Sequence, residues 1–163
     1  MDYIQLLQQR IQSVNDNVIL GLIYDEYFKL EDKITQLQRL QISKHEGFDD
    51  KILHSNLYDG FYAKSTQAFA DAENPYASKT SKSRGSAYNF VWGGEFFDGF
   101  KIKKEKEGIG LFSSGAYSTR SNGKTEFFES YDNMFGLNTE NTATIENEVL
   151  YYVLEKTFSK LYQ

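Results

Sequence analysis

The sequence contains no cysteine, one proline and two histidines among its 163 residues. Without cysteine the chain cannot form a disulfide framework, a thiolate zinc site or a cysteine nucleophile, and two histidines leave little for metal binding. The sequence shows no secretion signal and no apolar run long enough to cross a membrane. It therefore predicts a protein made in the cytoplasm, with no membrane partner.

The signatures of common enzymes are missing as well. The sequence has no Gly-x-Ser-x-Gly and no Gly-Lys-Ser/Thr, and neither histidine has the glutamate spacing of a helical zinc protease. The nearest approaches to a metal-dependent nuclease are Asp49-Asp50-Lys51 and Glu31-Asp32-Lys33. We expect both runs to be solvated charges, and we predict no catalytic residue, metal site or cofactor. A nuclease or other hydrolase that uses Asp49, Asp50 and Lys51 is an alternative.

Aromatic residues are numerous, with 13 Phe, 12 Tyr and 1 Trp. This is more aromatic surface than a domain of this size readily buries, so some rings are candidates for contact with partners. The other interpretation is that large rings fill a core that has few leucines and valines. Composition alone leaves both interpretations open.

The formal net charge of −5 is spread unevenly along the chain. Residues 1–70 carry 7 basic and 10 acidic side chains, residues 71–124 carry 9 and 6, and residues 125–163 carry 2 and 7. The acidic balance argues against a general nucleic-acid binder. A basic middle beside an acidic end favours contacts between copies, which in head-to-tail repetition can close a ring. Two solvated surfaces without a partner would give the same charges.

Helical periodicity marks the N-terminal part. Residues 2–14 predict a short amphipathic helix, and residues 18–43 predict a longer one that is capped by Asn15, Asp16 or Asn17. The longer helix has an apolar stripe and a polar side that is expected to face solvent. The polar positions include Glu31, Lys33, Gln36, Gln38 and Arg39.

A last helix is predicted, with Thr139 or Asn138 as its N-terminal cap. Its apolar residues cover more than a narrow face: Ile145, Val149, Leu150, Tyr152, Val153, Leu154, Phe158 and Leu161. We expect this helix either to cross the sheet deep in the core or to pack one side on a neighbouring subunit.

Between these helices the sequence predicts a break at residues 44–50 and mostly loops with short elements up to residue 72. The β signal begins near Ala87 and includes the run EFF at residues 95–97, and alternating residues then predict a hairpin over about 100–113. A short helix from Thr125 should contain Tyr131 and Met134 and end at Gly136. The chain is therefore expected to be a single α+β domain over residues 1–163. It has N-terminal helices, a small antiparallel β-sheet including a hairpin, and a long C-terminal helix.

Residues 71–86 are polar and small, and they predict an extended, mobile arm. A modest basic cluster lies in and beside this arm, next to two tyrosines. These candidate partner-contact residues are Tyr76, Lys79, Lys82, Arg84 and Tyr88. They fit a solvated loop, phosphate contact with aromatic stacking, or an arm that becomes ordered against an adjacent subunit.

Four stretches from residue 74 onward carry a family resemblance: NPYASKTSKSRGSAYNF, GGEFFDGFKIK, GIGLFSS and EFFESYDNMFGLNTEN. In the last stretch, the glycine of Phe135-Gly136-Leu137-Asn138-Thr139 suits the end of one helix, and Asn or Thr can cap the next. In this order, followed by the terminal helix, the stretches resemble small structural proteins from the head-to-tail gene region of tailed bacteriophages. The resemblance covers about 90 residues.

The resemblance implies a neck or tail-completion protein, which is a non-enzymatic component of the phage virion assembled in the host cytoplasm. Such a protein forms or decorates a ring at the head-to-tail connection. The implied partners are further copies of the chain and portal, adaptor or tail-tube proteins. No specific nucleic acid is implied beyond possible passage of the genome. The alternatives are the hydrolase above and a nucleic-acid accessory protein that uses residues 76–88.

Overall fold

The computed structural model describes residues 14–57, 59–71, 80, 82–91, 94–106, 108–114 and 125–162. Its elements are α2 (Asp16–Lys29), α3 (Glu31–Ser43), α4 (Lys64–Ala70), α5 (Glu95–Asp98), β1 (Phe100–Glu105), β2 (Gly108–Ser113), α6 (Thr125–Glu129) and α7 (Thr139–Tyr162). This is the expected α+β fold, with helices before an antiparallel hairpin and a long C-terminal helix. Within these ranges, no helix has the length and hydropathy needed to cross a membrane.

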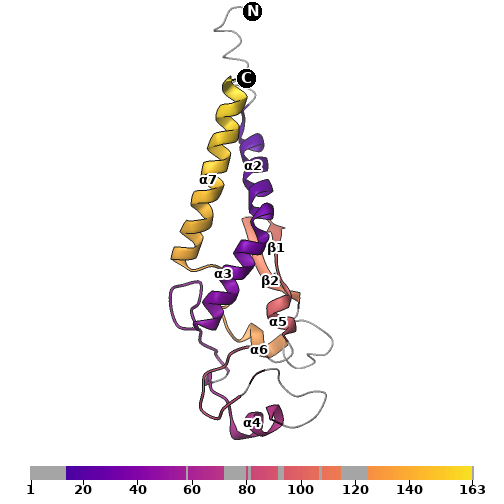
Figure 1. The fold of residues 1–163 in the computed structure, drawn as a ribbon, viewed down its shortest axis with the longest axis vertical. Helices are drawn as coiled ribbons and strands as arrows, with labels where there is room; N and C mark the ends of the chain where they lie inside the picture. The colour runs from indigo at the N-terminus through magenta and orange to yellow at the C-terminus, as the bar shows by residue number, and fades with distance from the viewer. Residues whose placement is uncertain are drawn as a thin grey trace, which may run out of the picture.

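The molecule is elongated, and α2 and α7 form a two-helix stalk at one end of it (Figure 1). The two helices run in opposite directions, so the start of α2 and the end of α7 lie together at the tip of the stalk. The hairpin packs against α3 in the middle of the molecule, and α4 lies at the far end. Among the described elements, α2 and α7 therefore pack mainly against each other along the stalk.

The long helix expected over residues 18–43 is divided into α2 and α3 at Leu30, whose backbone has φ −86° and ψ 7°. The capping prediction is confirmed, because the Asn15 side chain accepts a hydrogen bond from the Val18 amide at 3.1 Å. The division lets α2 follow α7 while α3 follows β1, which one straight helix could not do. The helix expected over residues 2–14 lies outside the described residues, apart from Val14.

The predicted hairpin is confirmed, with register from Phe100 opposite Ser113 to Glu105 opposite Gly108. Phe100 and Ile102 are buried and Lys101 is exposed, as the alternation requires. The Glu31 carboxylate on α3 accepts a hydrogen bond from the Ile102 amide at 3.1 Å. This contact joins the hairpin to α3.

The β prediction for residues 95–97 is wrong, because this run forms the helical turn α5. Phe96 is buried, and Phe97 also packs against the same core cluster. Neighbouring side chains point to opposite faces in a strand, whereas a helical turn can bring both rings toward one cluster. Before this turn, Ala87 forms an isolated bridge with Phe61 rather than part of a strand.

The core consists of two clusters. One is rich in aromatic rings, and Phe96 stacks on Phe128 with ring centroids 4.2 Å apart while Phe90 meets Tyr131 edge to face at 5.2 Å. The other is aliphatic and lies where α3, β1 and α7 meet: Ile34, Ile102, Ile145, Val149 and Val153. Much of the aromatic excess therefore fills the interior, where ring pairs add to the free energy gained by burial.

Two glutamines on α3, Gln38 and Gln41, are buried. The sequence pattern instead predicts that Gln38 lies on the solvent-facing side of its helix. The amide of Gln38 donates to the Met134 carbonyl at 2.7 Å and accepts from the Gly136 amide at 3.1 Å. Gln41 likewise donates to the Gly136 carbonyl at 2.9 Å and accepts from the Asn138 amide at 2.8 Å. These side chains satisfy backbone groups that have no partner within a helix or sheet.

The short helix α6 ends at Glu129, before the predicted Gly136, and the chain continues in turns in which the Tyr131 amide donates to the Phe128 carbonyl at 3.2 Å. Tyr131 and Met134 are buried, as their apolar spacing suggested, but they lie in turns after the helix. Asn138 then starts α7, because its side-chain oxygen accepts from the Asn141 amide at 3.0 Å. The Asn138 alternative for the cap is therefore confirmed.

Candidate functional site

Only part of the arm expected over residues 71–86 can be placed. Tyr76 and Lys79 lie outside the described residues. Arg84 is exposed, and its backbone amide donates to the Gln67 side chain at 3.0 Å. The other two predicted contact residues, Lys82 and Tyr88, point into the protein.

The Lys82 side chain is only 1% exposed, so it is not the solvated surface cation that the sequence suggested. Its ammonium group donates to Thr80 Oγ1 at 2.5 Å, to Asn89 Oδ1 at 2.5 Å and to the Val91 carbonyl. Burial lowers the pKa of Lys82 from 10.5 to about 8. This lysine holds neighbouring loop segments together.

Tyr88 belongs to the aromatic core. Its ring meets Tyr62 at 4.8 Å and Phe127 at 5.4 Å, both edge to face. The Tyr88 carbonyl also lies 2.7 Å from Nε2 of His45. The residues expected to form a phosphate-contacting surface are therefore not brought together in the described part of the chain.

The carboxylates of the alternative hydrolase site are used to hold the fold. Asp49 accepts from the Asn133 side chain at 2.8 Å, and this hydrogen bond, more than any other contact, lowers the pKa of Asp49. Asp50 accepts from the amide and the hydroxyl of Thr139 at the start of α7. Lys51 forms an ion pair with Asp49 at 3.4 Å. The two aspartates point to different partners.

The side chains of the second acidic run, Glu31-Asp32-Lys33, also contact different partners. Glu31 accepts a hydrogen bond from the Ile102 amide of the hairpin, and Lys33 forms an ion pair with Glu148 on α7. Among the residues that the structure describes, no group of three His, Cys, Asp or Glu side chains could hold a metal ion. These observations identify structural contacts for the candidate acids.

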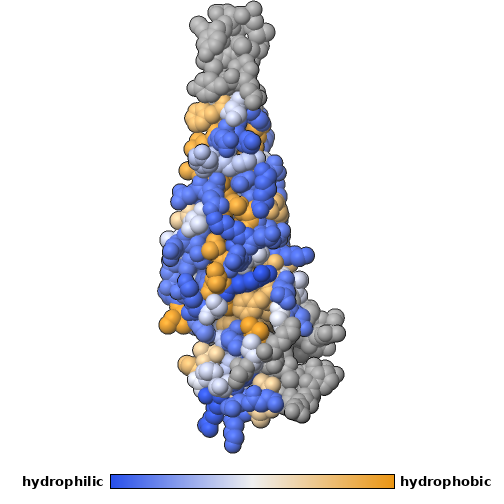
Figure 2. Space-filling model, viewed as in Figure 1, coloured by the Kyte–Doolittle hydropathy of each residue, from blue (hydrophilic) through white to orange (hydrophobic). Residues whose placement is uncertain are grey.

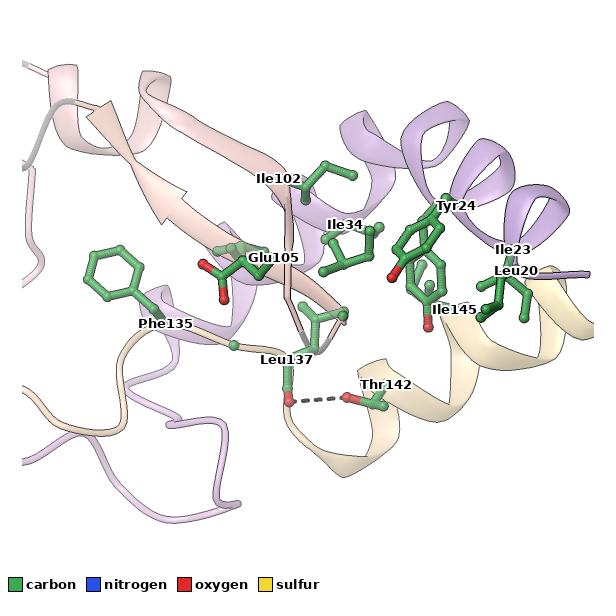
Figure 3. Close-up of a pocket in the computed structure, with 16 residues that line it drawn as sticks. Leu20, Ile23, Tyr24, Ile34, Ile102, Glu105, Phe135, Leu137, Thr142 and Ile145 are labelled. Carbon is green, nitrogen blue, oxygen red and sulfur yellow. Dashed lines mark hydrogen bonds between the residues drawn. The ribbon is translucent and has the colours of Figure 1, made fainter. Parts of the chain in front are cut away.

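A cavity of about 590 Å³ lies between α2, the hairpin and the start of α7 (Figure 3). Its lining is mainly hydrophobic, and Tyr24 and Ile23 on α2 lie across from Ile145 on α7. Glu105 contributes a carboxylate, which forms an ion pair with Lys103 at 2.9 Å. The cavity therefore offers apolar packing beside one paired carboxylate.

The outer side of α7 carries an apolar strip. Leu150 is 57% exposed, Tyr151 74% and Leu154 45%, whereas Val149 and Val153 on the inner side are buried. We call Leu150, Tyr151 and Leu154 the outer strip. Of the two alternatives for this helix, burial deep in the core holds for one side only: Val149 and Val153 join the aliphatic cluster, and the outer strip stays exposed on the stalk (Figure 1). On the face seen in Figure 2, hydrophobic patches lie between polar ones along the stalk.

The outer strip was only partly visible in the sequence. The sequence pattern includes Leu150 and Leu154 as residues that widen the apolar face, but it does not include Tyr151. The usable signal was that apolar residues occur on both sides of one helix. Which side faces solvent depends on where α2 packs.

No family model, curated protein or solved structure matches this chain.

Proposed function

We propose that the chain is a non-enzymatic structural subunit that associates with further copies of itself through the outer strip of α7. The supporting observation is that this helix has a buried apolar side and an exposed one. An apolar strip that stays exposed marks a surface for a partner. A second copy is a natural partner because homo-oligomers are the commonest soluble assemblies.

The energetics favour repeated contacts over one isolated pair. The exposed parts of Leu150, Tyr151 and Leu154 (57%, 74% and 45%) together equal fewer than two fully exposed side chains, so burying them contributes roughly 3 to 5 kcal/mol, at about 1.5 to 3 kcal/mol for each full side chain. Association costs about 4 to 15 kcal/mol in lost translational and rotational freedom. Burial of one strip therefore contributes a free energy near the lower end of the association cost. A subunit held on two sides in a closed ring gains stability, because closure adds a contact without further loss of freedom.

We place this assembly in the phage virion, as a ring or ring decoration at the head-to-tail connection. The sequence resemblance is the basis for this setting. The net charge of −5 fits it, because an acidic subunit repels DNA phosphates and lets the genome pass without adhesion. The partners at either side would be portal, adaptor or tail-tube proteins.

The first experiment measures molar mass by size-exclusion chromatography with light scattering over a range of concentrations. We expect the natural chain to associate and the variant L150D/L154D to be monomeric. Leu57→Asp is the matched control, because Leu57 is 64% exposed in a loop and should tolerate the same change without loss of association. A natural chain that stays monomeric up to its solubility limit would contradict the proposal.

The setting has its own experiment. Mass spectrometry of purified phage particles should detect the chain at a fixed ratio to the portal protein. Its absence from purified particles would remove the virion assignment, while self-association in solution would be unaffected.

A further inference from the structure

We propose that the outer strip of α7 docks on the outer face of the β1–β2 hairpin of a second copy. This inference rests on the proposed function, and it identifies the surface that receives the strip. It predicts a head-to-tail contact, in which two different surfaces meet.

The charges around the outer strip are acidic. Exposed glutamates 146 and 155 lie on its two edges, within about one turn of Leu150 and Leu154. Lys156 lies on the other side of the helix, because its ammonium group is 5.5 Å from the Tyr152 ring, which contacts Lys29 of α2. The strip is therefore an apolar surface with negative edges.

The outer face of the hairpin has the complementary character. Lys101 and Lys103 are exposed and alternate with the buried Phe100 and Ile102. Glu105 follows on the same face and pairs with Lys103 at 2.9 Å, so Lys101 gives this face its net positive charge. Phe112 lies opposite Lys101 in the register and is partly exposed, with Lys103 Nζ 5.5 Å from its ring. Phe112, flanked by the two lysines, can receive leucine and tyrosine side chains while the Lys101 ammonium group meets a glutamate.

These two surfaces cannot meet within one molecule. The inner residues of the hairpin and of α7, Ile102 and Val149, belong to the same buried cluster. Their outer faces therefore point away from each other, and Figure 1 shows α7 and the hairpin on either side of α2 and α3. Each copy has one acidic and one basic face to offer to its neighbours.

Charge also disfavours the pairing of α7 with α7. Each copy would bring exposed glutamates 146 and 155 to the edges of the shared interface, so four carboxylates would border it without a basic partner from the outer strip. Lysines on the hairpin face offer these glutamates partners of opposite charge.

The consequence is a heterologous interface. Such contacts close into a ring when the rotation between copies permits, and they otherwise form an open filament. The interface also depends on charge, so higher ionic strength should weaken it.

The absence of cysteine in the sequence makes disulfide trapping specific. Asn147→Cys lies on the exposed side of α7, and Lys101→Cys lies on the hairpin face. We expect the two proteins, mixed and oxidised, to form a crosslinked heterodimer at least tenfold faster than either protein alone. Gln36→Cys, on an exposed position of α3, is the matched control and should not crosslink with Asn147→Cys.

A charge exchange provides the second measurement. The variants K101E/K103E and E146K/E155K should each weaken association about tenfold, and mixing the two should restore it across the exchanged contact. Circular dichroism checks the fold of each variant. Faster crosslinking of Asn147→Cys with itself would show that α7 pairs with α7. If both charge variants associate as strongly as the natural chain, this inference is overturned but the proposed function stands. A natural chain that stays monomeric contradicts both.

Discussion

The buried glutamine Gln38 provides the sharpest test of how the fold is held together. Its side chain is fully buried, and it hydrogen bonds the carbonyl of Met134 and the amide of Gly136. The substitution Gln38→Ala removes both partners and leaves two backbone groups in the interior. Each unsatisfied group costs about 1 to 3 kcal/mol. We therefore expect the free energy of unfolding to fall by about 2 to 5 kcal/mol.

The measurement is urea denaturation followed by circular dichroism, with Gln36→Ala as the matched control. Gln36 lies on the same helix but is exposed, so its truncation should change the free energy of unfolding by less than about 0.5 kcal/mol. Gln41 holds the same backbone segment, so the double variant Q38A/Q41A should cost less than the sum of the single variants. If Gln38→Ala is as stable as Gln36→Ala, the reasoning about buried backbone groups is wrong.

Two further predictions concern a buried lysine and a strained glycine. The pKa of Lys82 is about 8 in the folded protein and 10.5 in the unfolded chain. Between these two pH values the unfolded state binds more protons than the folded state. This lysine therefore makes the free energy of unfolding rise with pH in that range. Urea titrations between about pH 8 and pH 10 should show that Lys82→Met removes an increase of at most about 1.4 kcal/mol per pH unit, and an unchanged pH profile would refute the shift. Gly136 has φ +139°, and an added Cβ would lie 2.9 Å from Phe48 Cβ, so Gly136→Ala should lower the free energy of unfolding by about 1 to 3 kcal/mol. Gly21→Ala, in open space on α2, should instead raise it by about 0.5 to 1 kcal/mol; urea denaturation measures both variants, and a similar loss in both would contradict this assignment.

Local sequence patterns predict an element correctly where the interactions that form it join residues close together in the chain. Asn15 caps α2 through a hydrogen bond three residues away, and the hairpin follows from alternation along two neighbouring runs. The run at residues 95–97 was assigned to a strand because its composition is aromatic. Its helical turn is set by where Phe96 and Phe97 pack, which is a property of the aromatic core.

Some features of the candidate site could likewise be predicted from local patterns, and others could not. The sequence showed that α7 is apolar on more than one side, and it showed the separation of basic and acidic charge along the chain. It placed Lys82 on a contact surface, whereas the structure buries that side chain in a network of hydrogen bonds. The burial of a long polar side chain depends on acceptors from distant residues, which no local pattern records.

The sequence alone therefore determined the α+β class, the hairpin, the cap of the first described helix and the wide apolar coverage of α7. These features arise from residues a few positions apart, whose spacing fixes which side chains share a face. Only the tertiary structure decided that Gln38 and Lys82 are interior groups and that α7 leaves one side open. Those outcomes depend on which elements pack together, because a face is buried only where another element covers it.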